Sequence, residues 1–151
     1  VYKRQDSTSH AIVTGTDYNP TLLDMLNIPA LPDQHRDGKS FVPALKDEDY
    51  DRGAVYWHFP HYSNHGFQSP NGAVRFGRYK LIEYYENGTV QLFDLENDIG
   101  EQNDLAGSHP AVTKKLKKML QQWRDDVDAK MPYPKTETSN PAPGARVAKP
   151  K

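Results

Sequence analysis

The dipeptide Asn87-Gly88 constrains the fold of this chain more than any other feature of its sequence. It separates two runs rich in β-branched and aromatic residues, 79–85 and 89–95. A two-residue type I′ turn needs positive φ angles at both of its central positions, and Asn followed by Gly is the pair that adopts them most easily. The pattern therefore predicts a β-hairpin that turns at Asn87-Gly88.

The predicted hairpin carries apolar side chains on both faces. With a turn at Asn87-Gly88, Tyr85 pairs with Val90 across the antiparallel ladder. Four apolar residues then lie on each face: Leu81, Tyr85, Val90 and Leu92 on one, and Ile82, Tyr84, Phe93 and Leu95 on the other. A sheet with one face in water alternates apolar and polar residues, so we expect another structural element or a partner surface to cover each face.

Two more strands are predicted upstream of the hairpin, at residues 54–59 and 72–77, with a long polar loop between them. Loops of this length in compact domains are more often functional than the short connections are. A binding or catalytic site is therefore expected first in the loop of residues 60–71.

Helical periodicity appears at two places. Residues 17–27 predict a short helix that is capped by Asp17 or Asn19 and has an apolar stripe of Leu22, Leu23 and Leu26. A long helix is predicted after Ser108 or His109, because Val112, Leu116, Met119, Leu120, Trp123 and Val127 recur at the 3.6-residue period. We therefore predict an α+β fold, in which the long C-terminal helix packs on one face of an antiparallel sheet of about four strands.

Three segments are expected along the chain. Residues 1–16 form a leading arm or an edge strand, residues 17–131 form the folded body, and residues 132–151, rich in proline and poor in large apolar residues, form an extended or disordered tail. The chain begins without methionine, so we expect it to be a processed or excised piece of a longer protein.

Composition excludes several classes of function. The formal charge of -1 gives no electrostatic reason for a nucleic-acid or anionic-membrane partner. No apolar run approaches the roughly 20 residues of a membrane-spanning helix. The chain has no cysteine, which excludes disulfides, thiolate metal sites and a cysteine nucleophile. No nucleophile elbow, phosphate-binding loop or zinc-protease motif is present either, so no catalytic residue is predicted in this chain.

Three histidines stand out at the predicted loop: His58, His61 and His65. Three neutral imidazoles with one open position would suit catalytic zinc, but this spacing is not a known zinc signature, and no metal ligand is predicted. The histidines are instead candidates for ligand contacts in a polar cleft, the alternative being surface or structurally hydrogen-bonded side chains. Arg75 joins them as a candidate, because an arginine can bind an anion through two hydrogen bonds; for Arg75 and Arg78 the alternative is an exposed ion pair.

Lysines at positions 114, 115, 117 and 118 lie mainly outside the apolar stripe of the long helix. They could form an anion site. The alternative, a solvated helix face, is favoured by Asp125 and Asp126, whose charges nearly balance the cluster.

Taken in order, several short blocks give the chain a family resemblance over residues 16–127. They are Thr16 to Asp24 with Ile28-Pro29, Asp37 to Phe41 with Pro43 to Leu45, Tyr56 to Pro60, Gly72 to Arg75, Gly77 to Ile82, Leu92 to Asp98 and Gly100 to Leu105. Together they resemble the C-terminal part of a type I, formylglycine-dependent sulfatase of the alkaline-phosphatase superfamily. Ile99 stands where many relatives have proline, a change expected to affect only the stiffness of that turn.

The resemblance implies a small C-terminal subdomain beside a large α/β catalytic domain. In that family the formylglycine, made from the cysteine or serine of C/S-x-P-x-R, and the calcium ligands belong to the large domain. The present chain contains no such motif, so calcium and formylglycine are expected in a missing N-terminal domain and no cofactor is expected here. The resemblance also implies a periplasmic or secreted enzyme.

The leading hypothesis is therefore the C-terminal part of a sulfuric ester hydrolase that acts on a sulfated carbohydrate or aryl sulfate. The chain alone is expected to be inactive, and His58, His61, His65 and Arg75 are expected to form the rim of the substrate pocket. The expected partner is the missing catalytic domain, with self-association through the uncovered sheet face as a further possibility. The alternative hypothesis is a non-catalytic carbohydrate-binding or interaction module, suggested by Trp57, Tyr62 and Phe67 in and beside the polar loop.

Overall fold

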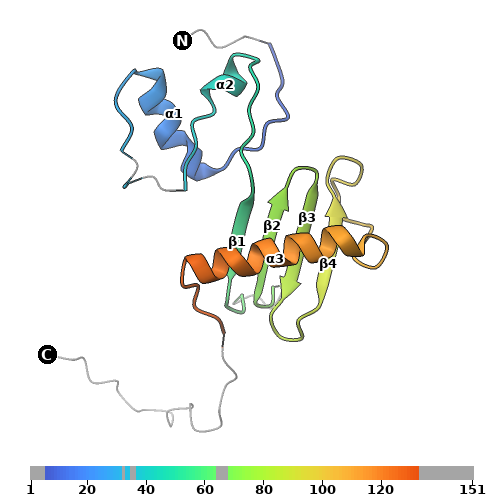
Figure 1. Ribbon diagram of the computed structural model, residues 1–151. Coiled ribbons are helices and arrows are strands. Elements are labelled where there is room, and N and C mark those ends of the chain that lie inside the picture. Colours follow the sequence, from blue (N-terminus) through green and yellow to red (C-terminus); the bar gives the residue numbers. More distant parts are fainter. Residues whose placement is uncertain (1–5, 32, 35–36, 64–67, 133–151) are drawn as a thin grey trace, which may run out of the picture. The chain divides into compact units, whose positions relative to one another are not determined.

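A computed structural model describes residues 6–31, 33–34, 37–63 and 68–132 (Figure 1). The chain divides into two compact units. The first comprises Val1–Val55 and Arg75–Gly77, and the second comprises Tyr56–Val74 and Arg78–Lys151. Among the described residues, no helix has both the length and the apolar character needed to cross a bilayer.

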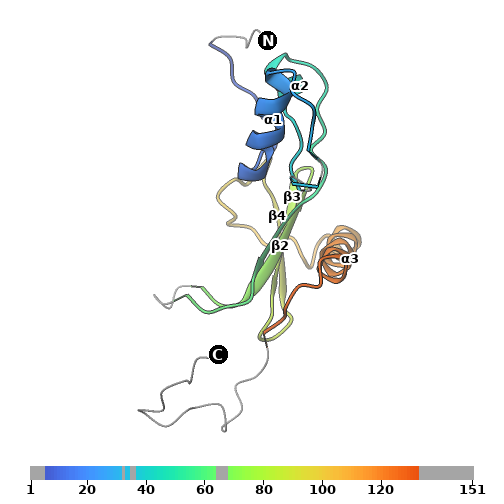
Figure 2. The same cartoon turned by 90° about the vertical axis from the view of Figure 1, so that its left-hand side faces the viewer.

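A four-stranded antiparallel sheet and one long helix account for most of the second unit. The strands are β1 (Val55–Phe59), β2 (Asn71–Phe76), β3 (Tyr79–Tyr84) and β4 (Val90–Asp94), in the spatial order β1-β2-β3-β4. Helix α3 (Pro110–Asp126) crosses one face of this sheet (Figures 1 and 2). The predicted α+β class, the four strands and the C-terminal helix are all confirmed.

The hairpin of β3 and β4 is confirmed, but its predicted two-residue turn is wrong. Leu81 pairs with Leu92, and Glu83 with Val90, so the register differs by two residues from the prediction. The ladder ends where the Tyr84 N–H donates to the Thr89 carbonyl at 2.9 Å. Four residues, 85–88, therefore form the loop. A shift by two residues leaves every side chain on its predicted face, because side chains alternate with period two.

Tyr85 explains why the turn is longer than predicted. Its N–H donates to the Pro70 carbonyl at 3.0 Å instead of pairing with β4. The loop then closes through the Gly88 N–H, which donates to the Tyr84 carbonyl at 2.9 Å, with Gly88 at a φ of +67°. Asn87 accepts a hydrogen bond from the Thr89 N–H. Asn87 and Gly88 thus still form the chain reversal. They do so within a four-residue loop that also contains Tyr85, which is not part of the β3–β4 ladder.

The core of the second unit lies between the sheet and α3. Its most deeply buried apolar side chains are Val74, Leu81, Leu92, Leu116 and Leu120, each at most 1% exposed. Leu81 and Leu92 are cross-strand partners, and Leu116 and Leu120 lie one turn apart on α3. The apolar stripe predicted for this helix therefore covers one face of the sheet, except at Val127, which follows the end of α3 and is 50% exposed.

A charged cluster is buried within the same helix–sheet layer. Arg124 on α3 is 6% exposed, and its Nη1 lies 2.7 Å from Oε2 of Glu83 on β3. The contact is an ion pair between two buried groups. Lys117 reaches the other oxygen of Glu83 at 3.1 Å, and the Arg124 guanidinium lies 5.4 Å from the centre of the Tyr85 ring. Glu83 is therefore compensated by two cations.

In the first unit, helices α1 (Tyr18–Met25) and α2 (Val42–Leu45) lie near a short 3-10 turn at Gly15–Asp17. Asp17 is completely buried and accepts hydrogen bonds from the N–H groups of Thr14 and Lys39 and from Nε of Arg52. Asp17 occupies the N-cap position of α1, which is one of the predicted alternatives. Its carboxylate does not cap the helix and instead binds the adjacent Thr14 and the more distant Lys39 and Arg52. Residues 6–14 contain no strand, and the predicted tail beyond residue 132 lies outside the described residues.

Candidate functional site

His58, the first predicted contact residue, has both ring nitrogens hydrogen-bonded within the second unit. Nδ1 lies 2.7 Å from the Tyr85 hydroxyl, and Nε2 lies 3.0 Å from the Lys130 carbonyl oxygen. A carbonyl can only accept, so Nε2 carries the proton, and in the neutral ring Nδ1 accepts from the hydroxyl. In this arrangement His58 ties β1 to the hairpin loop and to the segment after α3, and presents no free ring nitrogen to a ligand.

Gly72 on β2 makes room for this contact. A Cβ atom at that position would lie 2.2 Å from the Tyr85 hydroxyl oxygen. A side chain there would therefore displace the tyrosine on which His58 depends. Burial raises the pKa of the Tyr85 hydroxyl, an effect opposed by Arg124, so the tyrosine remains a neutral hydrogen-bond donor.

Of the other two histidines, only His61 belongs to the described part of the chain. His61 is exposed and packs edge-on against Phe59, with ring centres 5.9 Å apart. His65 lies outside the described residues. No group of three or more His, Cys, Asp or Glu side chains among those described could hold a metal ion. The zinc alternative needs His65 and is therefore not tested by the described residues.

The two arginines beside Gly77 differ. Arg75 is half-buried on β2, and its Nε is buried without a hydrogen-bond partner in the described structure. Arg78 binds the Asp94 carboxylate through both Nε and Nη2 and lies 3.3 Å from Glu96. The Arg78 guanidinium holds the pKa of Asp94 well below its usual range. Arg78 is thus engaged in a structural ion pair, whereas Arg75 retains unused donor capacity.

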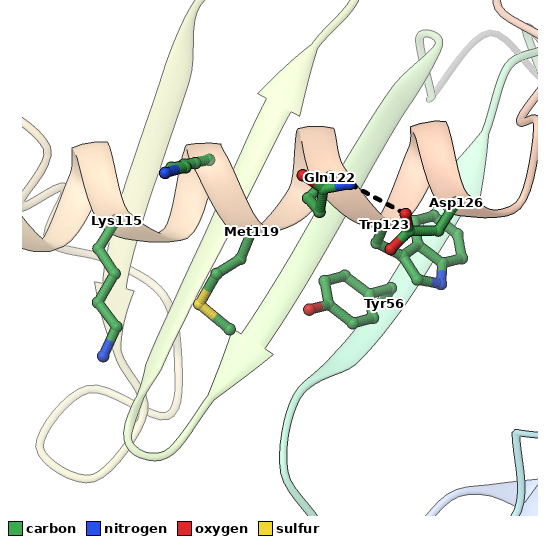
Figure 3. Close-up of a pocket in the computed structure, with 7 residues that line it drawn as sticks. Tyr56, Lys115, Met119, Gln122, Trp123 and Asp126 are labelled. Carbon is green, nitrogen blue, oxygen red and sulfur yellow. Dashed lines mark hydrogen bonds between the residues drawn. The ribbon is translucent and has the colours of Figure 1, made fainter.

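A groove runs beside α3, with β1 contributing one residue. Its lining residues are Tyr56, Lys115, Lys118, Met119, Gln122, Trp123 and Asp126, and it encloses about 460 Å³ (Figure 3). We call this the α3 groove. The rings of Tyr56 and Trp123 stack with centres 5.0 Å apart and planes 2° from parallel. Burial raises the pKa of the Tyr56 hydroxyl, and the nearby Asp126 charge adds to the effect.

The sequence analysis did not identify the α3 groove or the Glu83–Arg124 pair. Two signals pointed to the ion pair: Glu83 stands between apolar residues on a predicted strand, and Arg124 follows Leu120 by one turn on the buried helix stripe. Charges of opposite sign at two buried positions are the signature of such a pair, because neither charge can be buried alone. The groove has no comparable signal, since it requires β1 to lie beside the last turns of α3.

Comparison with known proteins identifies the family. Residues 2–126 match the family described as N-sulphoglucosamine sulphohydrolase, C-terminal. A sulfatase of Formosa agariphila is 28% identical over 146 residues, covering 80% of this chain and 26% of that protein. An N-acetylglucosamine-6-O-sulfatase of Bacteroides thetaiotaomicron is 29% identical over 76% of this chain and 21% of its own length. Arylsulfatase K of Gallus gallus is 31% identical, covering 78% of this chain and 23% of its own.

Solved structures agree in fold. A protein determined in complex with its substrate D-glucosamine-2-N,6-O-disulfate superposes with a TM-score of 0.61 at 24% identity, covering 77% of this chain and 24% of that one. The chain thus spans about a quarter of the length of the relatives that it matches. With the family match extending over residues 2–126, the chain belongs to the sulfatase family defined by the C-terminal region of N-sulphoglucosamine sulphohydrolase.

Proposed function

We propose that this chain is the C-terminal part of a sulfuric ester hydrolase that removes sulfate from sulfated carbohydrate, with aryl sulfate as the second substrate class. The observation that carries the proposal is the family match over residues 2–126. Support for a glucosamine-type substrate comes from the family description and from the relative named N-acetylglucosamine-6-O-sulfatase. Reading the coding sequence upstream of Val1 is a direct test, since it should encode roughly 300 further residues of a large domain that contains C/S-x-P-x-R.

The catalytic nucleophile is proposed to lie in the rest of the protein. This chain has no cysteine and no S-x-P-x-R from which formylglycine could be made. The described residues also offer no cluster of carboxylates for calcium, so no catalytic step through calcium is assigned to them. The proposed enzyme is periplasmic or secreted, a proposal that rests on the resemblance to sulfatases alone.

The predicted pocket rim remains a proposal, and we propose different roles for its members. His61 is exposed, so we propose that it contacts substrate directly, and Arg75 keeps its predicted contact role. His58 is engaged at both ring nitrogens and is proposed to position β1. His65 lies in the loop between His61 and Arg75, outside the described residues, and keeps its predicted contact role.

A surface on α1 supports the proposed partnership with a larger domain. Several large apolar side chains of α1 and the segment after it are exposed: Tyr18, Leu22, Met25, Leu26, Ile28 and Leu31. We call them the α1 patch. Leu22 is 56% exposed and Leu26 68%, although they lie one turn apart on the apolar side of the helix. Apolar patches of this kind on soluble proteins mark interaction surfaces, and we propose that the larger sulfatase domain covers this one.

The Leu22→Asp and Leu26→Asp double substitution tests this surface. In the full-length protein we expect a marked loss of stability, because full burial of each leucine contributes about 1.5–3 kcal/mol and a buried aspartate costs more. In residues 1–151 alone the same change should alter the free energy of unfolding by no more than about 0.5 kcal/mol. Chemical denaturation of both proteins measures the difference.

Ile99→Asp is the matched control, because Ile99 is 79% exposed and belongs to the second unit, whereas the α1 patch belongs to the first. It should be neutral in both proteins. If the double variant destabilises residues 1–151 as much as it does the full-length protein, the patch is covered within this chain. If light scattering shows that residues 1–151 form oligomers and that the double variant dissociates them, the α1 patch mediates self-association and not contact with a larger domain.

A carbohydrate-binding module without catalysis is the second candidate function. Trp57 and Tyr62 are 46% and 64% exposed, as a sugar-binding surface requires, and the α3 groove adds an aromatic pair. The upstream sequence separates the candidates, since a binding module needs no C/S-x-P-x-R domain.

A further inference from the structure

The α3 groove combines an apolar floor with charged walls. Met119 and the stacked Tyr56 and Trp123 rings form the apolar part, and all three side chains are only partly exposed (Figure 3). A volume of about 460 Å³ lies in the range of ligand pockets. Flat aromatic and thioether surfaces favour a ligand with an apolar face, such as the C–H face of a sugar ring.

The lysines of α3 differ in what they contact. Lys117 reaches inward to Glu83 at 3.1 Å and completes the buried charge cluster. Lys115 and Lys118 line the groove, three residues apart and therefore on one side of the helix. Lys114 does not line it. A lysine ammonium is a compact point charge with three donors, so the pair at 115 and 118 suits a sulfate group.

The opposite end of the groove has a different polarity. The Gln122 side-chain amide donates to the Asp126 carboxylate at 2.9 Å (Figure 3). A carboxylate repels sulfate but accepts hydrogen bonds from hydroxyl groups. Lys118 and Asp126 are eight residues apart, about 12 Å along the helix axis. A ligand that uses both ends therefore needs more than one sugar ring, with its sulfate at the lysine end and free hydroxyls at the Asp126 end.

We propose that the α3 groove binds a sulfated oligosaccharide, with sulfate on Lys115 and Lys118, a sugar ring against Met119, Tyr56 and Trp123, and hydroxyls on Gln122 and Asp126. The choice of ligand rests on the proposed function, whereas the site rests on the groove. The negative charge of a sulfated oligosaccharide complements Lys115 and Lys118. The C-terminal tail of this chain carries lysines of its own and would be repelled by them.

The test is titration of residues 1–151 with a heparin-derived tetrasaccharide and with its desulfated counterpart. The chain has two tryptophans, so a Trp57→Phe background leaves Trp123 as the sole fluorescence reporter. We expect a saturable change in Trp123 emission with the sulfated ligand, weakened by added salt because exposed charges are screened. Lys115→Ala with Lys118→Ala should weaken binding about tenfold or more, while Lys114→Ala, the matched control, should change the affinity less than about twofold.

Three outcomes would overturn the site: no change in Trp123 emission, equal weakening by Lys114→Ala, or equal affinity for the desulfated ligand. Equal weakening would mean a diffuse cationic surface, and equal affinity would mean a neutral-sugar site. Sulfate release by the full-length protein from a sulfated monosaccharide reports the proposed function separately. Sulfate release without tetrasaccharide binding would contradict only the proposed binding site in the α3 groove. Tetrasaccharide binding without sulfate release would contradict only the proposed hydrolase function.

Discussion

Replacing Arg124 with leucine is expected to destabilise the chain by about 3–5 kcal/mol, because it leaves the Glu83 carboxylate buried with a single, half-exposed cation. Arg124 is 6% exposed and lies 2.7 Å from Glu83. Small domains are stable by only about 5–15 kcal/mol, so the loss is a large share of the total. The second unit should then unfold at much lower denaturant concentration, which urea denaturation followed by far-UV circular dichroism measures.

Two further variants separate the charge effect from simple loss of packing. Lys117→Ala should cost about 0–1 kcal/mol, because the Lys117 side chain is 47% exposed and its ion pair with Glu83 is screened by solvent. The double variant Glu83→Leu with Arg124→Leu removes both buried charges and should be more stable than Arg124→Leu alone. If the single and double variants were equally stable, the Glu83 carboxylate would cost no stability when Arg124 is absent, and the predicted charge effect would be wrong.

Replacing Asp17 with alanine is expected to unfold the first unit, at a cost of about 3–5 kcal/mol. Asp17 is completely buried and accepts hydrogen bonds from Lys39, Arg52 and Thr14, so its loss leaves Nε of Arg52 and two backbone N–H groups without this acceptor. Limited proteolysis should then cut between Thr14 and Arg52. Asp24→Ala is the control, because Asp24 is exposed and its carboxylate accepts a hydrogen bond from the Ser40 hydroxyl in the described part of this unit. Equal protease resistance of both variants would contradict the role of Asp17.

The same carboxylate predicts part of the response to acid. Burial raises the pKa of Asp17, but hydrogen bonds from Lys39, Arg52 and Thr14 outweigh it, and the folded-state pKa lies below the ordinary value of 3.8. An unfolded state that binds protons more readily makes stability rise with pH. The contribution of Asp17 is therefore complete above about pH 4–5 and is lost as the pH falls through the folded-state pKa.

Local sequence patterns were sufficient for the elements of the fold. The period-two runs around Asn87-Gly88 and the 3.6-residue stripe from Val112 to Val127 predict the hairpin and α3. The register could not be predicted, because Tyr85 leaves the ladder to bond Pro70 and His58, both more than a dozen residues away along the chain. The stripe also predicts that Trp123 and Leu120 lie on one face of the helix, but it does not predict how deeply each is buried. Leu120 is fully buried, whereas Trp123 lines the α3 groove.

The candidate site was less accessible from sequence. Histidine spacing drew attention to His58, yet the partners that occupy its ring nitrogens, Tyr85 and Lys130, follow it by 27 and 72 residues. Contacts of such separation depend on the packing of β1 against the rest of the second unit, for which a local pattern carries no signal. The same holds for the Tyr56–Trp123 stack. Family resemblance, in contrast, depended only on the order of short blocks, and the match over residues 2–126 confirms it.

Measured sulfate release decides whether this chain is the non-catalytic part of a sulfuric ester hydrolase. Residues 1–151 and the full-length protein would each be incubated with glucosamine carrying N- and 6-O-sulfate and with an aryl sulfate, and free sulfate would be quantified. We expect release by the full-length protein and none by residues 1–151, which lack a formylglycine precursor motif. Metal-dependent release by purified residues 1–151, or none by the full-length protein with a C/S-x-P-x-R motif and its modification intact, would contradict it.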